Sequence, residues 1–174
     1  TIGIALAGPG AFGQKHLDAL KNIADVKIVS LIGRNLDQAR EVAAKYGAPH
    51  VTQDLSESLA HPDVDAVILC TPTQIHADQA MQCLRAGKHV QVEIPMADSW
   101  SDAQALTHLQ KQQGLIAMVG HTRRFNPSHQ WVHHKIISGQ YSIQQMDVQT
   151  YFFRRTNINA LGQPRSWTDH LLWH

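Results

Sequence analysis

The sequence lacks a charge imbalance, a cysteine framework and a long apolar run. Its 15 lysines and arginines nearly balance its 14 aspartates and glutamates, so composition suggests no basic surface for nucleic acid or for a membrane. The only cysteines, Cys70 and Cys83, form no C-x-x-C motif, which favours a reducing cytoplasm. No apolar stretch approaches the roughly 20 residues of a transmembrane helix. We therefore expect a cytoplasmic protein without nucleic-acid or membrane partners.

What the sequence contains is an alternation of apolar strands and helical patterns. Strands are predicted at 2–7, 26–32, 66–70, 89–92 and 116–119, and helices at 11–22, 36–46, 56–60, 75–86 and from Asp98 or Ser99 to 113. Continuous apolar strands between helices are typical of a parallel sheet covered on both faces. Right-handed crossovers then predict a doubly wound α/β fold of the Rossmann type.

The pattern changes near Gly120, where a histidine-rich cationic segment begins. We expect a dinucleotide-binding domain at 1–120. Residues 121–174 are too few for a stable domain of their own, so we expect them to be the first part of a longer second domain. A helix is predicted at 127–138, a long strand of mixed polarity at 143–153 and a helix at 167–174.

A glycine-rich turn follows the first predicted strand and opens the first predicted helix. Its sequence, Gly8-Pro9-Gly10-Ala11-Phe12-Gly13, is the G-x-G-x-x-G pattern in the context that a dinucleotide site requires. Gly8 permits the tight turn, Gly10 lets the backbone approach a pyrophosphate, and Gly13 lets the helix pack against the strand. The amides of the first helical turn, including those of Ala11 and Phe12, would bind the anion.

The end of the second predicted strand indicates which dinucleotide binds. An NAD site usually places an acidic residue there, on the adenosine ribose, but this chain has Gly33 followed by Arg34. A guanidinium attracts a 2′-phosphate and can bond it bidentately. We therefore predict NADP as cofactor, with NAD as the weaker alternative; Arg34 could otherwise be only an exposed residue at a helix start.

The other ends of the predicted strands should complete the site, because ligands of open α/β sheets bind outside the carboxyl ends of the strands. These ends supply the remaining candidate cofactor contacts. They are Cys70, Thr71, Pro72, Thr73, Glu93, Ile94 and His121. His76, just after the third of these strands, is a further candidate, although it could also be a solvent-facing residue at a helix start.

Four motifs in order resemble the glucose-fructose oxidoreductase, inositol dehydrogenase and rhizopine-catabolism (Gfo/Idh/MocA) family. They are Thr71-Pro72-Thr73-Gln74-Ile75-His76, Ala86-Gly87-Lys88-His89-Val90, Glu93-Ile94-Pro95 and Arg124-Phe125-Asn126-Pro127. The resemblance implies an oxidoreductase with a second, open-faced α+β domain whose sheet makes dimer contacts, and a role for Glu93 near the nicotinamide ribose. Ile94 stands where the family usually has a lysine, and isoleucine cannot transfer a proton.

More narrowly, the stretches 92–99, 120–129 and 165–174 resemble a branch of the family that acts in aromatic catabolism. That branch oxidises the cyclic hemiacetal of a dicarboxylate with NADP as acceptor. Two carboxylates call for arginines, and the candidates are Arg123, Arg124 and Arg165. Trp167, in the last stretch, is carried over as a cofactor contact.

Oxidation of a hemiacetal requires a base for the hydroxyl proton, and histidine suits this role near neutral pH. His170 and His174 share one face of the predicted last helix at i, i+4 spacing, and Asp169 could orient one of them. Three readings compete with this one. His129, His133 and His134 have helical spacing that could hold zinc; the chain could be a non-catalytic NADP-binding module; or it could be a sugar or cyclitol dehydrogenase of the same family.

Overall fold

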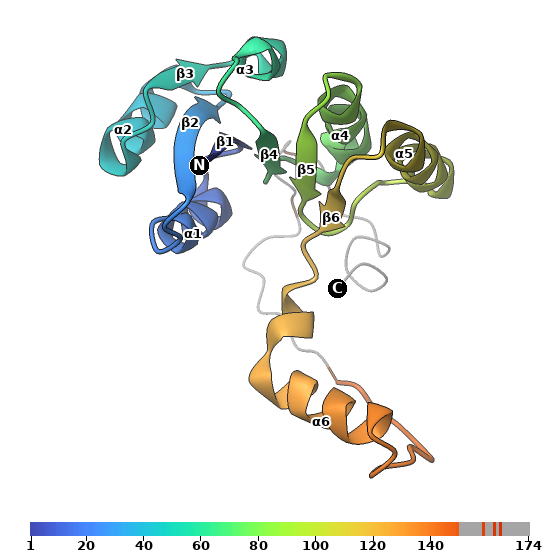
Figure 1. The fold of residues 1–174 in the computed structure, drawn as a ribbon. Coiled ribbons are helices and arrows are strands. Elements are labelled where there is room, and N and C mark those ends of the chain that lie inside the picture. Colours follow the sequence, from blue (N-terminus) through green and yellow to red (C-terminus); the bar gives the residue numbers. More distant parts are fainter. Residues whose placement is uncertain (150–157, 159–161, 163, 165–174) are drawn as a thin grey trace. The chain divides into compact units, whose positions relative to one another are not determined.

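A computed structural model describes residues 1–149 together with positions 158, 162 and 164. Its first part is a six-stranded parallel sheet with helices on both faces (Figure 1). The strands are β1 (Ile2–Ala7), β2 (Val26–Ile32), β3 (His50–Thr52), β4 (Ala66–Leu69), β5 (His89–Val92) and β6 (Ala117–Val119). The helices between them are α1 (Ala11–Leu20), α2 (Leu36–Tyr46), α3 (Leu55–Ala60), α4 (His76–Arg85) and α5 (Trp100–Gln113), with a short 3₁₀ turn, η1 (Thr73–Ile75).

The strands lie in the order β3-β2-β1-β4-β5-β6. The chain therefore starts in the middle of the sheet, winds outwards to β3, and returns to the other side of β1 to build β4, β5 and β6. The predicted doubly wound α/β fold is confirmed. The order of the strands reverses between β1 and β4, and open sheets of this kind bind their ligands at the carboxyl ends of the strands where the order reverses.

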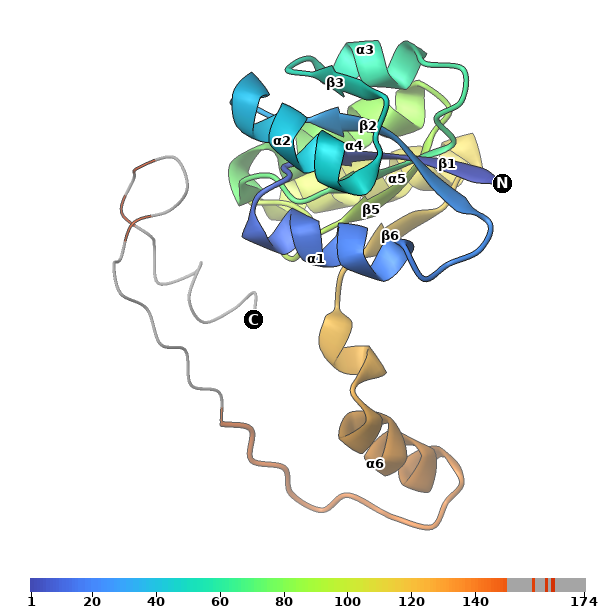
Figure 2. The same ribbon diagram turned by 90° about the vertical axis from the view of Figure 1, so that its left-hand side faces the viewer.

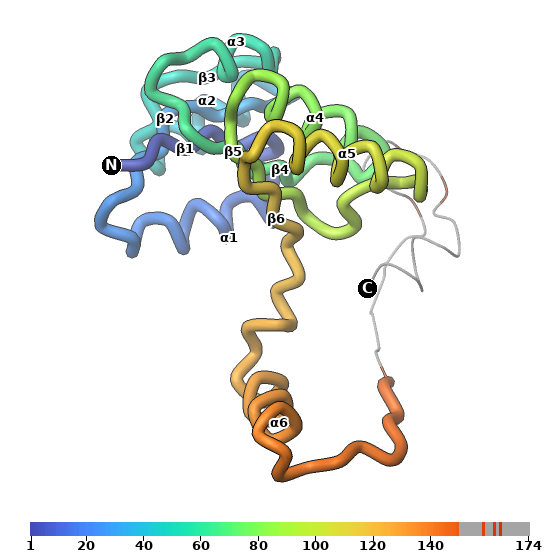
Figure 3. Tube along the Cα trace, turned by 45° about the vertical axis from the view of Figure 1, so that its right-hand side comes forward, coloured from blue at the N-terminus to red at the C-terminus, as the bar shows by residue number. Residues whose placement is uncertain are grey.

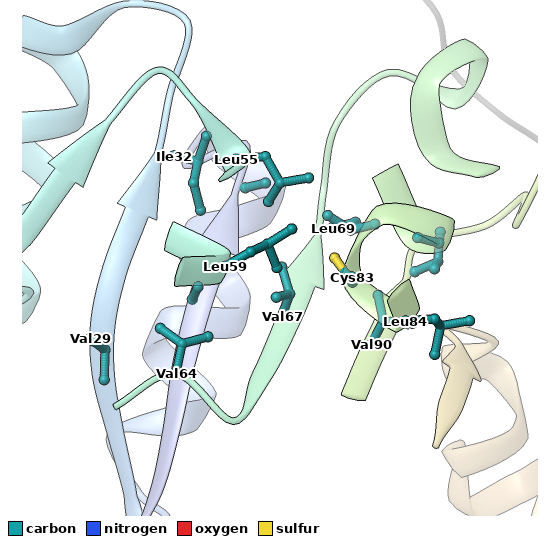
Figure 4. Close-up of a cluster of buried hydrophobic side chains, with 14 of the residues drawn as sticks. Val29, Ile32, Leu55, Leu59, Val64, Val67, Leu69, Cys83, Leu84 and Val90 are labelled. Atoms are coloured by element: carbon teal, nitrogen blue, oxygen red, sulfur yellow. The ribbon is translucent and has the colours of Figure 1, made fainter. Parts of the chain in front are cut away.

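Two apolar layers hold the sheet between its helices. Side chains alternate along a strand, so Ile4 and Leu6 of β1 face α1 and α2, while Ala5 and Ala7 face the other layer. Figure 2 shows α1 and α2 in front of the sheet and α4 and α5 behind it. Figure 3 shows α4 and α5 side by side. Figure 4 shows the larger cluster, in which leucines and Cys83 from α3 and α4 meet valines of β2, β4 and β5.

The helix ends follow the polar and glycine signals in the sequence. The side chain of Asn35 accepts hydrogen bonds from the amides of Asp37 and Gln38 and so begins α2, which ends at Gly47 in the left-handed conformation. Ser99 begins α5 in the same way. These caps satisfy backbone groups that a helix end would otherwise leave unpaired.

Of the strands in the described residues, only β3 was not predicted from the sequence. It has only three residues and pairs with β2, Ser30 lying opposite His50. The Ser30 hydroxyl lies 2.9 Å from His50 Nδ1 and 2.6 Å from the Ser58 hydroxyl. So short a segment shows no periodicity of its own, and its extended form depends on the strand beside it.

The chain divides into two compact units, with the change at Gly120–His121. The described part of the second unit contains a 3₁₀ turn, η2 (Thr122–Phe125), and helix α6 (Pro127–Ile137). The strand predicted at 143–153 is wrong over 143–149, which form no regular element. Ile143, Met146 and Val148 are exposed, and an apolar alternation becomes a strand only where another strand pairs with it. Residues 150–153 and the helix predicted at 167–174 lie outside the described residues.

Among the described residues, no helix combines the length and the apolar character that a membrane span requires.

Gly13 provides a test of the packing between α1 and β1. A methyl group there would lie 2.2 Å from the Gly8 carbonyl oxygen and 3.1 Å from Leu6 Cδ2. Gly13→Ala should therefore lower the free energy of unfolding by about 1–3 kcal/mol, although alanine normally stabilises a helix by about 1 kcal/mol relative to glycine. The measurement is the urea midpoint of the cofactor-free protein.

Gly10→Ala is the matched control, because a methyl group at Gly10 meets nothing within 4 Å. Its stability should stay within about 0.5 kcal/mol of the parent. Equal stabilities of all three proteins would contradict the close contact described for Gly13.

Candidate active site

The glycine-rich turn lies at the carboxyl end of β1, against the end of β4. Gly8 has φ +86°, and a side chain on it would come within 2.5 Å of the Cys70 carbonyl oxygen. Gly13 lies as closely against the turn itself, whereas Gly10 is exposed with open space around it. Close packing thus accounts for glycine at positions 8 and 13, and the backbone at Gly10 is open to a ligand; its contact with a pyrophosphate stays a prediction.

Helix α1 begins at this turn without a capping side chain, since Gly10 occupies the N-cap position. The amides of the first helical turn have no partner within the helix. Ala11 and Phe12 are both exposed. This helix end can therefore bind an anion through backbone amides and the helix dipole.

The end of β2 combines a buried glycine with an exposed arginine. A Cβ at Gly33 would lie 2.8 Å from Ala39 Cβ and 3.3 Å from Pro9 Cγ, so helix α2 leaves no room for a larger side chain. Arg34 is exposed, and among the described residues none pairs with its guanidinium. Close packing therefore excludes an acidic side chain at position 33, and the guanidinium of Arg34 is available beside it.

His76 is buried, with 1% of its surface exposed. Its Nδ1 lies 2.7 Å from the carbonyl oxygen of Pro95 and its Nε2 lies 2.6 Å from that of Thr71. Carbonyl oxygens only accept, so each contact is a hydrogen bond when that nitrogen carries hydrogen. The imidazole joins the segments after β4 and β5, which excludes the solvent-facing alternative; direct contact of His76 with a cofactor stays a prediction.

The carboxyl group of Glu93 is buried at the end of β5. Its Oε1 lies 2.7 Å from Nε2 of His16, on α1, and 3.4 Å from the side-chain nitrogen of Gln91. A Cβ at Gly120 would lie 2.8 Å from the same oxygen, so that glycine gives the carboxyl group its space. Glu93 is therefore a held group and not a solvated strand end.

Sequence reasoning missed His16, which was not among the predicted site residues. A signal was available, because a histidine three residues after Gly13 lies on the same face of the helix. That face packs against the sheet, where a polar ring needs a partner. Its partner is 77 positions away in the chain.

Cys70, Thr71 and Ile94 line the same edge. Burial, and after it the charge of Glu93, raises the pKa of the Cys70 thiol from 9.0 to about 12, so the sulfur stays protonated at neutral pH. The Thr71 hydroxyl donates to the side-chain oxygen of Gln79 at 2.6 Å. Ile94 is half-buried and offers no group for proton transfer. Pro72 and Thr73 follow on this rim, both half-buried.

The remaining predicted site residues belong to the second unit or lie outside the described residues. His121, Arg123 and Arg124 are exposed in the second unit, around η2. Arg165, Trp167, Asp169, His170 and His174 lie outside the described residues. His129, His133 and His134 are exposed on α6 and form no metal-binding group; among the described residues, only His16, Cys70 and Glu93 lie close enough together to do so.

Comparison with known proteins agrees with this architecture. The Gfo/Idh/MocA family model, described as an oxidoreductase family with an NAD-binding Rossmann fold, matches residues 2–121, and a model for the C-terminal part of bacterial oxidoreductases matches residues 127–174. The chain is 71% identical over 171 residues to the 4-carboxy-2-hydroxymuconate-6-semialdehyde dehydrogenase of Sphingobium sp., covering 98% of this chain and 54% of that protein. The chain thus spans about half the length of that relative.

Two solved structures place the fold in the same group. An apo scyllo-inositol dehydrogenase from Lactobacillus casei is 25% identical with a TM-score of 0.77, over 80% of this chain and 42% of that one. GenD2 from gentamicin A biosynthesis, solved in complex with NAD, is 28% identical with a TM-score of 0.74, over 76% of this chain and 38% of that one. Since the family model matches more than half of its residues, the chain belongs to the Gfo/Idh/MocA family of oxidoreductases.

Proposed function

We propose that the protein is an NADP-dependent dehydrogenase that oxidises the cyclic hemiacetal of 4-carboxy-2-hydroxymuconate-6-semialdehyde to 2-pyrone-4,6-dicarboxylate. The observation that carries the substrate is the 71% identity over 171 residues to the Sphingobium dehydrogenase named for that semialdehyde. The phosphate loop, with an open Gly10 and an uncapped α1, supports the dinucleotide. The proposed setting is cytoplasmic, with a dimer formed through the second domain.

The reaction removes a hydride and a proton from one C–OH group of the hemiacetal. The C–H bond breaks and its electron pair goes with the hydrogen to the nicotinamide of NADP; the hydroxyl proton goes to a base, and the carbon becomes the lactone carbonyl. Ile94 cannot be this base. We assign the role to His170 or His174, with Asp169 to orient the imidazole.

The two substrate carboxylates would bind arginines. Arg123 and Arg124 are exposed in the second unit, and Arg165 follows in the sequence. Guanidinium groups bind carboxylates bidentately, and such bonds strengthen away from water. This proposal makes the second unit, with the segment around 165–174, the part that recognises the substrate.

The function is tested by an assay on the full-length protein. The ring-closed semialdehyde is the substrate, and NADPH formation is followed by absorbance. We expect turnover with the semialdehyde and none with myo-inositol or scyllo-inositol. Turnover only with a cyclitol would instead establish that the protein is a sugar or cyclitol dehydrogenase. Tight NADP binding without turnover on either substrate would establish a non-catalytic module.

Arg34 tests the choice of NADP. Arg34→Ala should raise the Kd for NADP by about 10- to 100-fold, because a charge-assisted hydrogen bond contributes about 1.5–3 kcal/mol. The Kd for NAD should change little, since NAD lacks the 2′-phosphate. Both constants can be measured by calorimetry.

Arg85→Ala is the matched control for Arg34. Arg85 is an exposed arginine in the last turn of α4, at the opposite edge of the sheet from the phosphate loop. The Arg85→Ala variant should bind NADP and NAD with the same Kd values as the parent protein. A parallel loss of NADP and NAD affinity in Arg34→Ala would argue that Arg34 supports the fold and does not read the phosphate.

Gly10 tests the phosphate loop. In Gly10→Ala the fold keeps its packing, because nothing lies within 4 Å of the new methyl group. That methyl group would occupy the space through which the pyrophosphate approaches the backbone. We expect at least a tenfold rise in the Kd for NADP, by calorimetry, with an unchanged urea midpoint; unchanged affinity would place the pyrophosphate elsewhere.

A further inference from the structure

We propose that His16 is a positioning residue: it holds Oε1 of Glu93 so that Oε2 can accept a hydrogen bond from a hydroxyl of the nicotinamide ribose. This inference rests on the proposed cofactor. His16 belongs neither to the phosphate loop nor to the candidates for the base. Three features of Glu93 support this role of His16: the burial of the carboxyl group, the different partners of its two oxygens, and its position along the cofactor.

The first feature is that Glu93 is buried and, among the described residues, has no lysine or arginine as an ion-pair partner. The residue is 8% exposed, and the described residues offer its carboxyl group only His16 and Gln91 as hydrogen-bonding partners. A buried carboxyl group needs such partners. His16 Nε2 lies 2.7 Å from Oε1, whereas the side-chain nitrogen of Gln91 lies 3.4 Å from it. His16 therefore determines where the carboxyl group lies.

The second feature is that the two carboxylate oxygens have different hydrogen-bonding partners. Both partners, His16 and Gln91, bind Oε1. Within the described part of the chain no hydrogen-bond donor reaches Oε2. A carboxylate oxygen accepts up to two hydrogen bonds, so Oε2 remains available for a donor that the chain itself does not supply.

The third feature is the position of Glu93 along the bound cofactor. The pyrophosphate belongs at the β1–α1 turn and the adenosine at the end of β2, beside Arg34. The other half of the dinucleotide must then extend over the ends of β4 and β5, across the reversal of strand order. Glu93 is the first residue after β5, and its amide is fixed by a 3.0 Å bond to the Leu69 carbonyl at the end of β4.

The orientation of His16 is itself determined by its surroundings. The ring packs edge-on against Phe12, one helical turn earlier, with centroids 5.7 Å apart. Because Gly13 brings α1 so close to the turn, the ring at position 16 reaches the end of β5. One helix thus carries both the amides for the pyrophosphate and the imidazole that holds Glu93.

A metal ion bound by His16, Cys70 and Glu93 is the competing explanation, since their ligand atoms lie within 4.8 Å of one another. One observation disfavours it: the 2.7 Å contact between His16 Nε2 and Glu93 Oε1 is a hydrogen-bond distance, so these two atoms already pair with each other.

The experiment compares two ligands on His16→Leu and His16→Gln. Adenosine 2′,5′-bisphosphate carries the adenosine and its 2′-phosphate but no nicotinamide ribose. In His16→Leu we expect the Kd for NADP to rise about tenfold or more while the Kd for the bisphosphate stays the same. In His16→Gln the side-chain amide can still donate to Oε1, so affinity for NADP should return to within about threefold of the parent.

The pairing with Glu93 is tested by a double-mutant cycle. Glu93→Ala should lose NADP affinity, and His16→Leu should add little to that loss, because residues that act through one contact are not additive. His108→Leu, an exposed histidine on α5, is the matched control and should bind both ligands normally. Additive losses, or an equal loss for the bisphosphate, would overturn the proposal.

Two further outcomes separate the proposals from one another. A parent protein that binds no NADP would reject the proposed function itself, whereas a parent that binds NADP with an unaffected His16→Leu variant would reject only the role of His16. Stoichiometric zinc in the purified protein that disappears in His16→Leu would assign the cluster to a metal and overturn the positioning role.

Discussion

The contact on which the site depends is the close approach of backbone to backbone where β1 ends. The turn at Gly8 lies against the Cys70 carbonyl, and α1 lies against that turn at Gly13. A side chain at Gly8 would collide with the Cys70 carbonyl group, and one at Gly13 would push α1 away from the turn. Because the helix is so close, its first amides lie at the edge of the sheet and His16, further along, reaches Glu93.

The polar groups at this edge divide into those that hold the protein together and those that remain open to a ligand. Both nitrogens of the His76 imidazole lie against backbone carbonyl oxygens of the segments after β4 and β5. Arg34 and the amides at Gly10 have no such duties among the described residues. Glu93 belongs to both groups, with one oxygen held by His16 and the other available. A dinucleotide site of this kind needs a rigid rim and a few unsatisfied donors and acceptors.

The replacement of the family's usual lysine by Ile94 changes where the chemistry can take place. The rim after β5 keeps its carboxyl group but offers no proton-transfer group at the next position. We therefore propose a base after residue 120, in the part of the chain that also supplies the arginines proposed for the carboxylates. The proposed function thus assigns cofactor binding to the first 120 residues and substrate chemistry largely to those after them.

The sequence by itself determined the parts whose information is local. The glycine spacing, the apolar strands and the caps at Asn35 and Ser99 act within a few residues, so the Rossmann order and the phosphate loop could be predicted. The absence of an acidic residue at Gly33 was readable too, although its close packing against Ala39 was not. The strand of mixed polarity predicted at 143–153 was wrong over 143–149, because an extended segment becomes a strand only where a partner strand pairs with it.

Tertiary structure alone decided which distant groups meet. Strand β3 forms beside β2, His76 is buried between two carbonyl groups, and His16 meets Glu93 across 77 positions. Hydrophobic periodicity specifies the face of an element, but the neighbour of a polar side chain on that face follows from the order of strands in the sheet. The roles of single polar residues therefore emerge only once the chain has folded back on itself.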